Sequence, residues 1–242
     1  MTNLPRPLHR IPVVAACLMF AGVIALPISA AAQAAGNTAQ GRAGGPQFVC
    51  SQVIGLTLTR EWYQAGFEQA AGIADDRWQL KARQSGYITE WSNPSSDFWN
   101  QQPQSPCANG SASPDHVVLT VLSWRPPCCA TQAEWETQVG KAVATLQSKY
   151  AGLKRVDLMT VVRGPRNQGC PAPPATDEYI AMPQEFDAAL AGVAARFPGL
   201  VFVGPKTEAP ACASFVGGGP HLTKDGNAEV AKAIAAYFVK HQ

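Results

Sequence analysis

Two short segments of the chain carry residue types that could perform acyl transfer. Thr57 stands in Gly55-Leu56-Thr57-Leu58, directly after an apolar run, and His221 stands in a glycine-rich stretch near the chain end. A hydroxyl group becomes a useful nucleophile only when a base removes its proton, and the ordinary pKa of histidine, near neutrality, suits that task. A hydroxyl group and an imidazole could together perform such chemistry, provided that the fold brings Thr57 and His221 together.

Each of these residues also has a structural interpretation. Thr57 is a suitable cap for a following helix, and on the residues alone capping is the more frequent use of such a threonine. His221 could likewise cap a helix or bind a backbone carbonyl group. Ser51 and His116 lie inside or at the start of apolar runs, and we expect both to be structural.

Arg163 and three tryptophans are candidates for substrate binding. Arg163 follows an expected strand and could bind an anionic or sugar oxygen, with a salt bridge as the alternative. Trp91, Trp99 and Trp124 could line a carbohydrate platform or fill contacts in the core and loops. Among these we take Arg163 and Trp124 as the possible substrate-binding residues.

The elements that must position these residues alternate between strand-like and helix-like runs. Strands are expected at 48–54, 78–82, 116–122, 155–162 and 200–203, most of them rich in Val, Ile and Leu. Helices are expected after Thr59, after the capping box formed by Thr131 and Glu134, from Pro183, and over 225–240. This alternation predicts a mostly parallel sheet with helices on both faces, in which ligands bind at the carboxyl ends of the strands. The segment 91–113 reads as a long surface loop.

The order and spacing of these segments, from Phe48 to the end, resemble the SGNH/GDSL hydrolase superfamily. That family places a serine nucleophile in the turn after the first strand, where this chain has Thr57, and its catalytic histidine before the last helix, where Pro220 to Gly226 surround His221. The resemblance implies a flavodoxin-like three-layer α/β/α sandwich with a mostly parallel five-stranded sheet. It also implies an oxyanion hole formed by Gly86 and the backbone of Thr57, and hydrolysis of an ester such as an O-acetyl group on a glycan.

The chain departs from the family pattern at its key positions. Thr57 replaces the serine, Leu56 the aspartate of the signature, and Gly218 the acid three residues before the histidine. The stretch after the third expected strand lacks the oxyanion-hole asparagine and has Ser123-Trp124-Arg125 instead. These departures describe a degenerate member, which is either a slow or specialised hydrolase or a catalytically silent domain that binds a carbohydrate or cell-envelope ligand. A disulfide-held structural protein without a small-molecule site is a third interpretation.

The amino terminus has the layout of a signal peptide over residues 1–34. Arg6 and Arg10 precede an uncharged apolar run over 11–28, and Ala32-Gln33-Ala34 offers a cleavage site. An uncleaved anchor, or a lipoprotein modified at Cys17, are the alternatives. Residues 35–46 read as a flexible leader, and 47–242 as one α/β domain that acts in the periplasm or outside the cell.

Charge and cysteine content narrow the partners of the mature chain. Two of the 19 Lys and Arg residues lie in the expected signal peptide, so the mature chain has 17 basic residues and 17 Asp and Glu. With a formal charge near zero, nothing in it recruits nucleic acid or an anionic membrane. Six cysteines follow Cys17, an even number that predicts disulfides, with Cys170–Cys212 as the first choice of pair. The sequence indicates no metal and no cofactor, and we expect a monomer that acts on a small-molecule or glycan ester.

The signal-peptide interpretation predicts a mature protein that begins between Ser29 and Gly36, because the uncharged run ends there in small residues. Amino-terminal sequencing of the exported form tests this. An exported form that begins at Met1 would contradict it.

Overall fold

The computed structural model describes residues 48–71, 77–84, 87–104, 106–107, 113–122, 128–165, 183–217 and 219–241. The chain separates into two compact units, Met1–Ala43 and Gly44–Gln242, and all described residues belong to the second. The expected signal peptide and flexible leader lie outside the described residues, so the domain boundary at 47 stays a prediction. Within the described part of the chain, no helix is long and apolar enough to cross a membrane.

Five strands form one parallel sheet, as expected. They are β1 (Ser51–Gly55), β2 (Trp78–Ala82), β3 (His116–Val121), β4 (Arg155–Thr160) and β5 (Val201–Val203). Their order is β2-β1-β3-β4-β5, and each neighbouring pair is parallel. After β1 the chain forms β2 on one side of that strand, and it then forms β3 on the other side. The strand order therefore reverses between β1 and β3, which is where open α/β sheets bind ligands.

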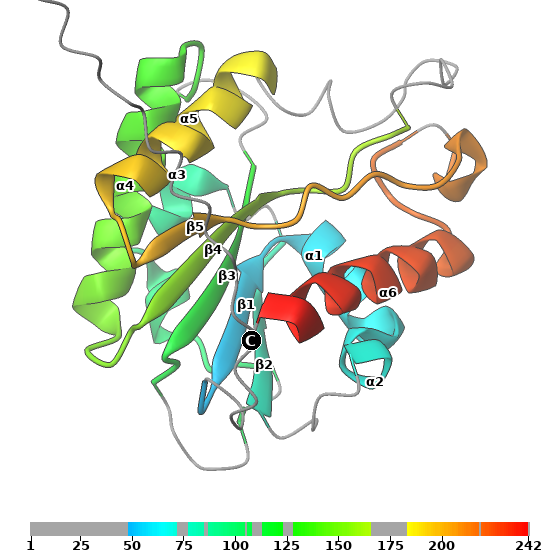
Figure 1. The fold of residues 1–242 in the computed structure, drawn as a ribbon, viewed down its shortest axis with the longest axis horizontal. Coiled ribbons are helices and arrows are strands. Elements are labelled where there is room, and N and C mark those ends of the chain that lie inside the picture. The colour runs from blue at the N-terminus through cyan, green and yellow to red at the C-terminus, as the bar shows by residue number, and fades with distance from the viewer. Residues whose placement is uncertain are drawn as a thin grey trace, which may run out of the picture. The chain divides into compact units, whose positions relative to one another are not determined.

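Helices cover both faces of the sheet (Figure 1). One face carries α3 (Ile88–Trp91), α4 (Gln132–Lys149) and α5 (Pro183–Arg196), and the other carries α1 (Thr57–Trp62), α2 (Glu68–Ala71) and α6 (Lys224–His241). Each layer has its own apolar core, one around Trp135 and Phe186 and the other around Trp62 and Phe238. The three-layer sandwich expected from the resemblance is confirmed.

Local signals in the sequence fix several helix ends. The capping box of α4 forms as expected, because Thr131 Oγ1 accepts from Glu134 N at 3.2 Å and the Glu134 carboxylate accepts from Thr131 N at 3.1 Å. The fifth helix begins at Pro183, also as expected. The first helix differs from expectation: it begins at Thr57 and continues into a π-helical segment, Tyr63–Phe67, where Gly66 has φ 111°. Only glycine adopts that backbone conformation without strain.

The segment expected to be a long surface loop is exposed at most of its described residues, but a few of its side chains pack into the core. Trp91 and Phe98 are fully buried with ring centroids 4.1 Å apart, and residues 97–100 form a short 3-10 helix. Lys81 of β2 donates to the carbonyl group of Trp99 at 3.1 Å. The expectation rested on the Pro, Ser, Asn and Gln content of the segment, whereas its aromatic side chains decide its packing.

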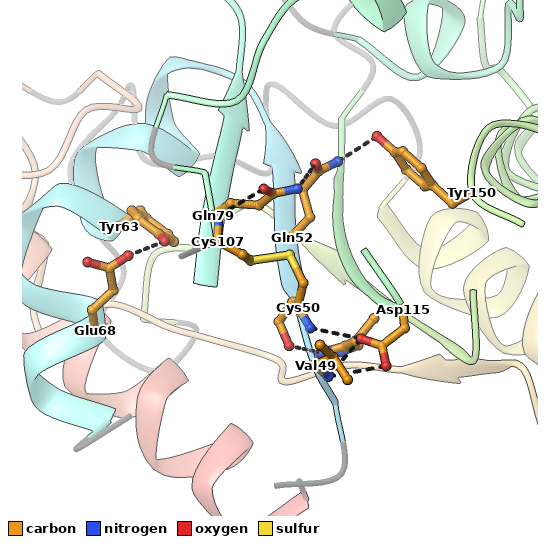
Figure 2. Close-up of a disulfide and its surroundings, with 11 residues drawn as sticks. Val49, Cys50, Gln52, Tyr63, Glu68, Gln79, Cys107, Asp115 and Tyr150 are labelled. Atoms are coloured by element: carbon orange, nitrogen blue, oxygen red, sulfur yellow. Dashed lines mark hydrogen bonds between the residues drawn. A yellow bond between two sulfur atoms is a disulfide. The ribbon is translucent and has the colours of Figure 1, made fainter. Parts of the chain in front are cut away.

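A disulfide ties the amino end of β1 to this segment. Cys50 and Cys107 are bonded, with their Cα atoms 6.0 Å apart (Figure 2). Cys128 and Cys129 are bonded to each other, and Cys212 is also disulfide-bonded, although its expected partner Cys170 lies outside the described residues. Disulfide use is thus confirmed for each described cysteine.

Hydrogen bonds hold the region around this disulfide (Figure 2). Gln79 donates to Gln52 at 2.6 Å, and Gln52 donates to the hydroxyl group of Tyr150 at 2.8 Å, so β2, β1 and the end of α4 are joined. At the start of β1, the Asp115 carboxylate accepts from the backbone of Val49 and Cys50 at 3.0 Å. Burial tends to raise the pKa of Asp115, but these bonds and the ammonium group of Lys154 outweigh it and lower that pKa.

Removal of the Cys50–Cys107 bond should destabilise the domain strongly. The bond closes a loop of 57 residues, and the chain-entropy model gives about 4 kcal/mol for a loop of that size. We expect Cys50→Ser with Cys107→Ser to lower the free energy of unfolding by about that amount in urea titrations. The wild-type domain, titrated with and without a reductant, is the reference, and an unchanged urea midpoint in the double variant would count against the assigned role.

Candidate active site

The turn from β1 into α1 is built around Gly55. A Cβ atom on Gly55 would lie 2.2 Å from Thr59 Oγ1, so no larger residue fits there without a shift of the helix. Thr59 is fully buried, and its Oγ1 accepts from the backbone of Leu56, the N-cap residue, at 3.3 Å. Thr57 is the first residue of α1 and not its cap, so the capping interpretation of Thr57 is wrong.

Glu61 lies one helical turn beyond Thr57. Residues four apart in an α-helix share a face, with Cβ atoms about 5–6 Å apart. The Glu61 carboxylate lies 2.8 Å from Nδ1 of His221, and the side chains of Glu61 and His221 are 29% and 52% exposed. The expected base is therefore held at the face of α1 that begins with the expected nucleophile.

The loop that carries His221 is fastened on both sides of that residue. Phe215 and Leu222 form an antiparallel bridge, and Val216 N donates to the carbonyl group of His221 at 2.8 Å. After His221, Thr223 Oγ1 accepts from Gly226 N at 3.1 Å and so caps α6.

Gly226 and Asn227 complete this attachment from the first turn of α6. A Cβ atom on Gly226 would lie 2.7 Å from the carbonyl oxygen of Ser214, which explains the glycine at that position. The side chain of Asn227 donates to the carbonyl group of Leu222 at 3.1 Å. His221 therefore projects from a hydrogen-bonded loop, although it lies near the surface.

Little space remains between α1 and this loop. A cavity of about 10 Å³, room for about one water molecule, is lined by Leu58, Glu61, Val162, Pro220 and Leu222. Larger open hollows of about 600 and 550 Å³ lie beside α4 and beside α6, and neither is lined by Thr57 or His221.

Direct contact between nucleophile and base stays a prediction. Within the described residues, no hydrogen bond joins Thr57 Oγ1 to His221, and Nε2 of His221 has no protein partner there. Gly86 and Trp124 lie outside the described residues, as do Gly218 and the rest of Ser123-Trp124-Arg125.

Arg163 has a partner within the protein. It is buried, and its two terminal nitrogens each lie 3.0 Å from an oxygen of Asp187 on α5. Burial tends to raise the pKa of Asp187, but Arg163 outweighs this and lowers it. The geometry is the salt bridge that the sequence offered as the alternative to substrate binding. Trp91 lies in the core and forms no open platform, whereas Trp99 is partly exposed and packs on Phe98.

A serine, a histidine and an aspartate also lie together at the end of the sheet opposite to the candidate site. Ser51 Oγ is 2.9 Å from His116 Nδ1, His116 Nε2 is 2.8 Å from Asp157, and Arg155 donates to both oxygens of Asp157. Ser51, His116 and Asp157 are 3%, 1% and 0% exposed, so no substrate reaches them. Their burial agrees with the structural role expected for Ser51 and His116.

Burial sets the protonation states of His116 and Asp157. It lowers the pKa of His116, and this effect outweighs the bond to Asp157. Burial tends to raise the pKa of Asp157, but His116 and Arg155 outweigh it and lower that pKa. The folded protein therefore holds His116 neutral and Asp157 ionised.

Sheet order and site placement define the class of fold. A parallel sheet in the order β2-β1-β3-β4-β5 with helices on both faces is flavodoxin-like, and Thr57 and His221 lie where its strand order reverses. These features agree with the resemblance to the SGNH hydrolases.

Comparison with known proteins finds likeness in structure alone. No model of a known protein family matches the chain, and no curated protein matches its sequence. The periplasmic domain of a lipopolysaccharide acetyltransferase from Salmonella ser. Paratyphi A is 12% identical with a TM-score of 0.48, and the match covers 79% of this chain and 84% of that one. Est24, a carbohydrate acetylesterase from Sinorhizobium meliloti, is 15% identical with a TM-score of 0.46, over 80% of this chain and 100% of that one. At these values the likenesses assign no activity to this chain.

The neutral state of His116 predicts that the fold loses stability as the pH falls. The lowered pKa means that the unfolded chain binds a proton at His116 more readily than the folded one, so stability is present above about pH 6.5 and declines below it. Urea unfolding between pH 8 and pH 5 measures this slope. His116→Gln should flatten the slope while lowering stability at pH 8. A wild-type stability that does not change between pH 7 and pH 5 would contradict the prediction.

Proposed function

We propose that this chain is an exported ester hydrolase of the SGNH type, in which Thr57 attacks the acyl carbon and His221 acts as the base. One observation carries the proposal: through Glu61, His221 is bound to the face of α1 that begins with Thr57. The substrate class is a small-molecule or glycan ester, with an O-acetyl group on a sugar as the leading candidate. The signal-peptide layout of residues 1–34 supports action in the periplasm or outside the cell. The monomeric state expected from the sequence is part of the same proposal.

The first half of the reaction transfers the acyl group to Thr57. His221 Nε2 takes the proton of the Thr57 hydroxyl group as Oγ1 forms a bond to the carbonyl carbon. The carbonyl π electrons move to oxygen, and the tetrahedral intermediate then collapses. The bond to the alcohol oxygen breaks, and that oxygen takes the proton from His221 Nε2. The products are free alcohol and an acyl ester of Thr57.

The second half restores the protein with water as the co-reactant. A water molecule gives a proton to His221 Nε2 while its oxygen attacks the acyl carbon. The bond between that carbon and Thr57 Oγ1 then breaks, and Oγ1 takes the proton back. A carboxylic acid leaves, and Thr57 and His221 return to their starting states.

The oxyanion of both intermediates requires hydrogen-bond donors. We assign this role, as the resemblance implies, to the backbone N–H groups of Gly86 and Thr57. The first four N–H groups of a helix have no acceptor within it, and Thr57 is the first residue of α1. The loss of one such donor typically costs about 10² to 10³ in rate, so the missing asparagine of the family implies a slow enzyme.

A catalytically silent domain that binds a carbohydrate or cell-envelope ligand at the same edge is the second candidate. The observation in its favour is that, within the described residues, Thr57 Oγ1 makes no hydrogen bond to His221. The two candidates differ in turnover, which is directly measurable.

Substitution of Thr57 tests the proposal. Thr57→Ser should keep or raise the hydrolysis of a short-chain aryl ester, because serine offers the same oxygen without the crowding methyl group. Thr57→Val and His221→Ala should each abolish turnover, the valine at nearly unchanged volume. Steady-state kinetics of the purified mature domain give the readout.

Thr137→Val is the matched control, because Thr137 lies exposed on α4 and its hydroxyl group donates to a backbone carbonyl within the same helix. Full turnover in a folded Thr57→Val sample would exclude Thr57 as the nucleophile. No turnover in the wild type with any short-chain ester would favour the silent domain.

A further inference from the structure

We infer that Glu61 is the positioning acid of His221 and takes the place of the acid that the family pattern has at Gly218. The inference rests on the proposed function and names a residue that the resemblance does not supply. In a Ser-His-Asp triad the acid orients the imidazole and stabilises its protonated form, and it does not itself take up the proton. In this chain that acid comes from α1, the helix that also carries Thr57.

The bond between Glu61 and His221 fixes where the histidine proton lies. An ionised carboxylate is an acceptor only, so the neutral imidazole makes the 2.8 Å bond through a proton on Nδ1. The other nitrogen, Nε2, then carries the lone pair that a general base needs. Glu61 thus selects the ring form in which Nε2 can take the Thr57 proton.

The placement of Glu61 is fixed by the packing of α1. Thr59 and Trp62, on either side of Glu61 in the helix, are both fully buried. With these neighbours anchored in the core, the backbone of Glu61 cannot move independently of the sheet. Its side chain also lines the small cavity together with Pro220, which directly precedes His221.

The sequence also supports a role for Glu61 in place of the acid that is missing at Gly218. Glu61 is the one acidic residue between Phe48 and Phe67, and it lies four residues after Thr57, so both project from one face of the helix. A chain that has lost the acid near its histidine can regain the interaction from this position, because the helix already lies beside the His221 loop.

The expected contribution of Glu61 is smaller than that of a buried triad acid. Loss of a buried triad aspartate costs about 10⁴ in kcat. The carboxylate of Glu61 is 29% exposed and the imidazole 52%, so water screens their interaction. We expect Glu61→Ala to lower kcat between about 10-fold and 10³-fold, within the limit that a buried acid sets.

The first measurement reads the ring of His221 without any substrate. In ¹⁵N NMR spectra of the whole domain above pH 8, neutral His221 should carry its proton mainly on Nδ1, and Glu61→Ala should move the population toward the Nε2–H form. Glu61→Gln keeps a carbonyl acceptor and should preserve the Nδ1–H form. Glu229→Ala, which removes an exposed carboxylate from α6, should change nothing. The same ring form in wild type and Glu61→Ala would overturn the inference.

The second measurement is kinetic and separates this inference from the proposed function. Glu61→Ala should lower kcat with little change in KM, and Glu61→Asp should restore part of the loss. Unchanged turnover in Glu61→Ala would overturn the inference while the proposed function stands. An inactive wild type would instead overturn the proposed function, and the ring measurement would still decide whether Glu61 orients His221.

Discussion

The close approach of α1 to the end of β1 is the constraint on which the candidate site depends. At Gly55 the space that a side chain would occupy is filled by Thr59, whose hydroxyl group also accepts the backbone bond from Leu56. The chain therefore turns into the helix directly after the strand, and Thr57 becomes its first residue. Because the buried residues of α1 fix its rotation, Glu61 faces the loop of His221. One missing Cβ atom thus determines the positions of three polar side chains.

The polar groups at the two ends of the sheet differ in their exposure to water. At the amino end, Ser51, His116, Asp157 and Arg155 form a chain of hydrogen bonds across three parallel strands. A buried ion costs several kcal/mol unless its partners satisfy it, so any slip in strand register would leave these groups unpaired. At the carboxyl end the polar groups remain partly in water, where a substrate can meet them. The residue types that suggest catalysis occur at both ends, and access alone distinguishes them.

Much of this architecture could be predicted from the sequence, because it depends on local patterns. Most of the strands are rich in Val, Ile and Leu, the capping box at Thr131 and Glu134 marks its helix, and Pro183 marks another. What the sequence did not reveal depends on contacts between distant residues. Cys50 pairs with Cys107, 57 residues away, and polar neighbours in the sequence conceal the packing of Trp91 against Phe98 in the segment between them.

Glu61 was missed for a related reason. Its partner His221 lies 160 residues away, and the family pattern directs attention to the position before the histidine instead. The available signal was the helical spacing from Thr57 to the one acidic residue near it. This spacing becomes informative once one asks which other carboxylate could replace the acid that is missing at Gly218.

Export, as we propose it, gives the disulfide between Cys50 and Cys107 a further consequence. In a reducing compartment the bond would be absent, and the polypeptide would lack a substantial part of its final folding free energy. A translocation channel that accepts only extended chains would meet less resistance from such a precursor. Oxidation on the far side of the membrane would close the loop and make the folded form harder to unfold. The state of the bond would thus differ between the two compartments. Its absence would favour the unfolded chain that is translocated, and its presence would favour the folded domain afterwards.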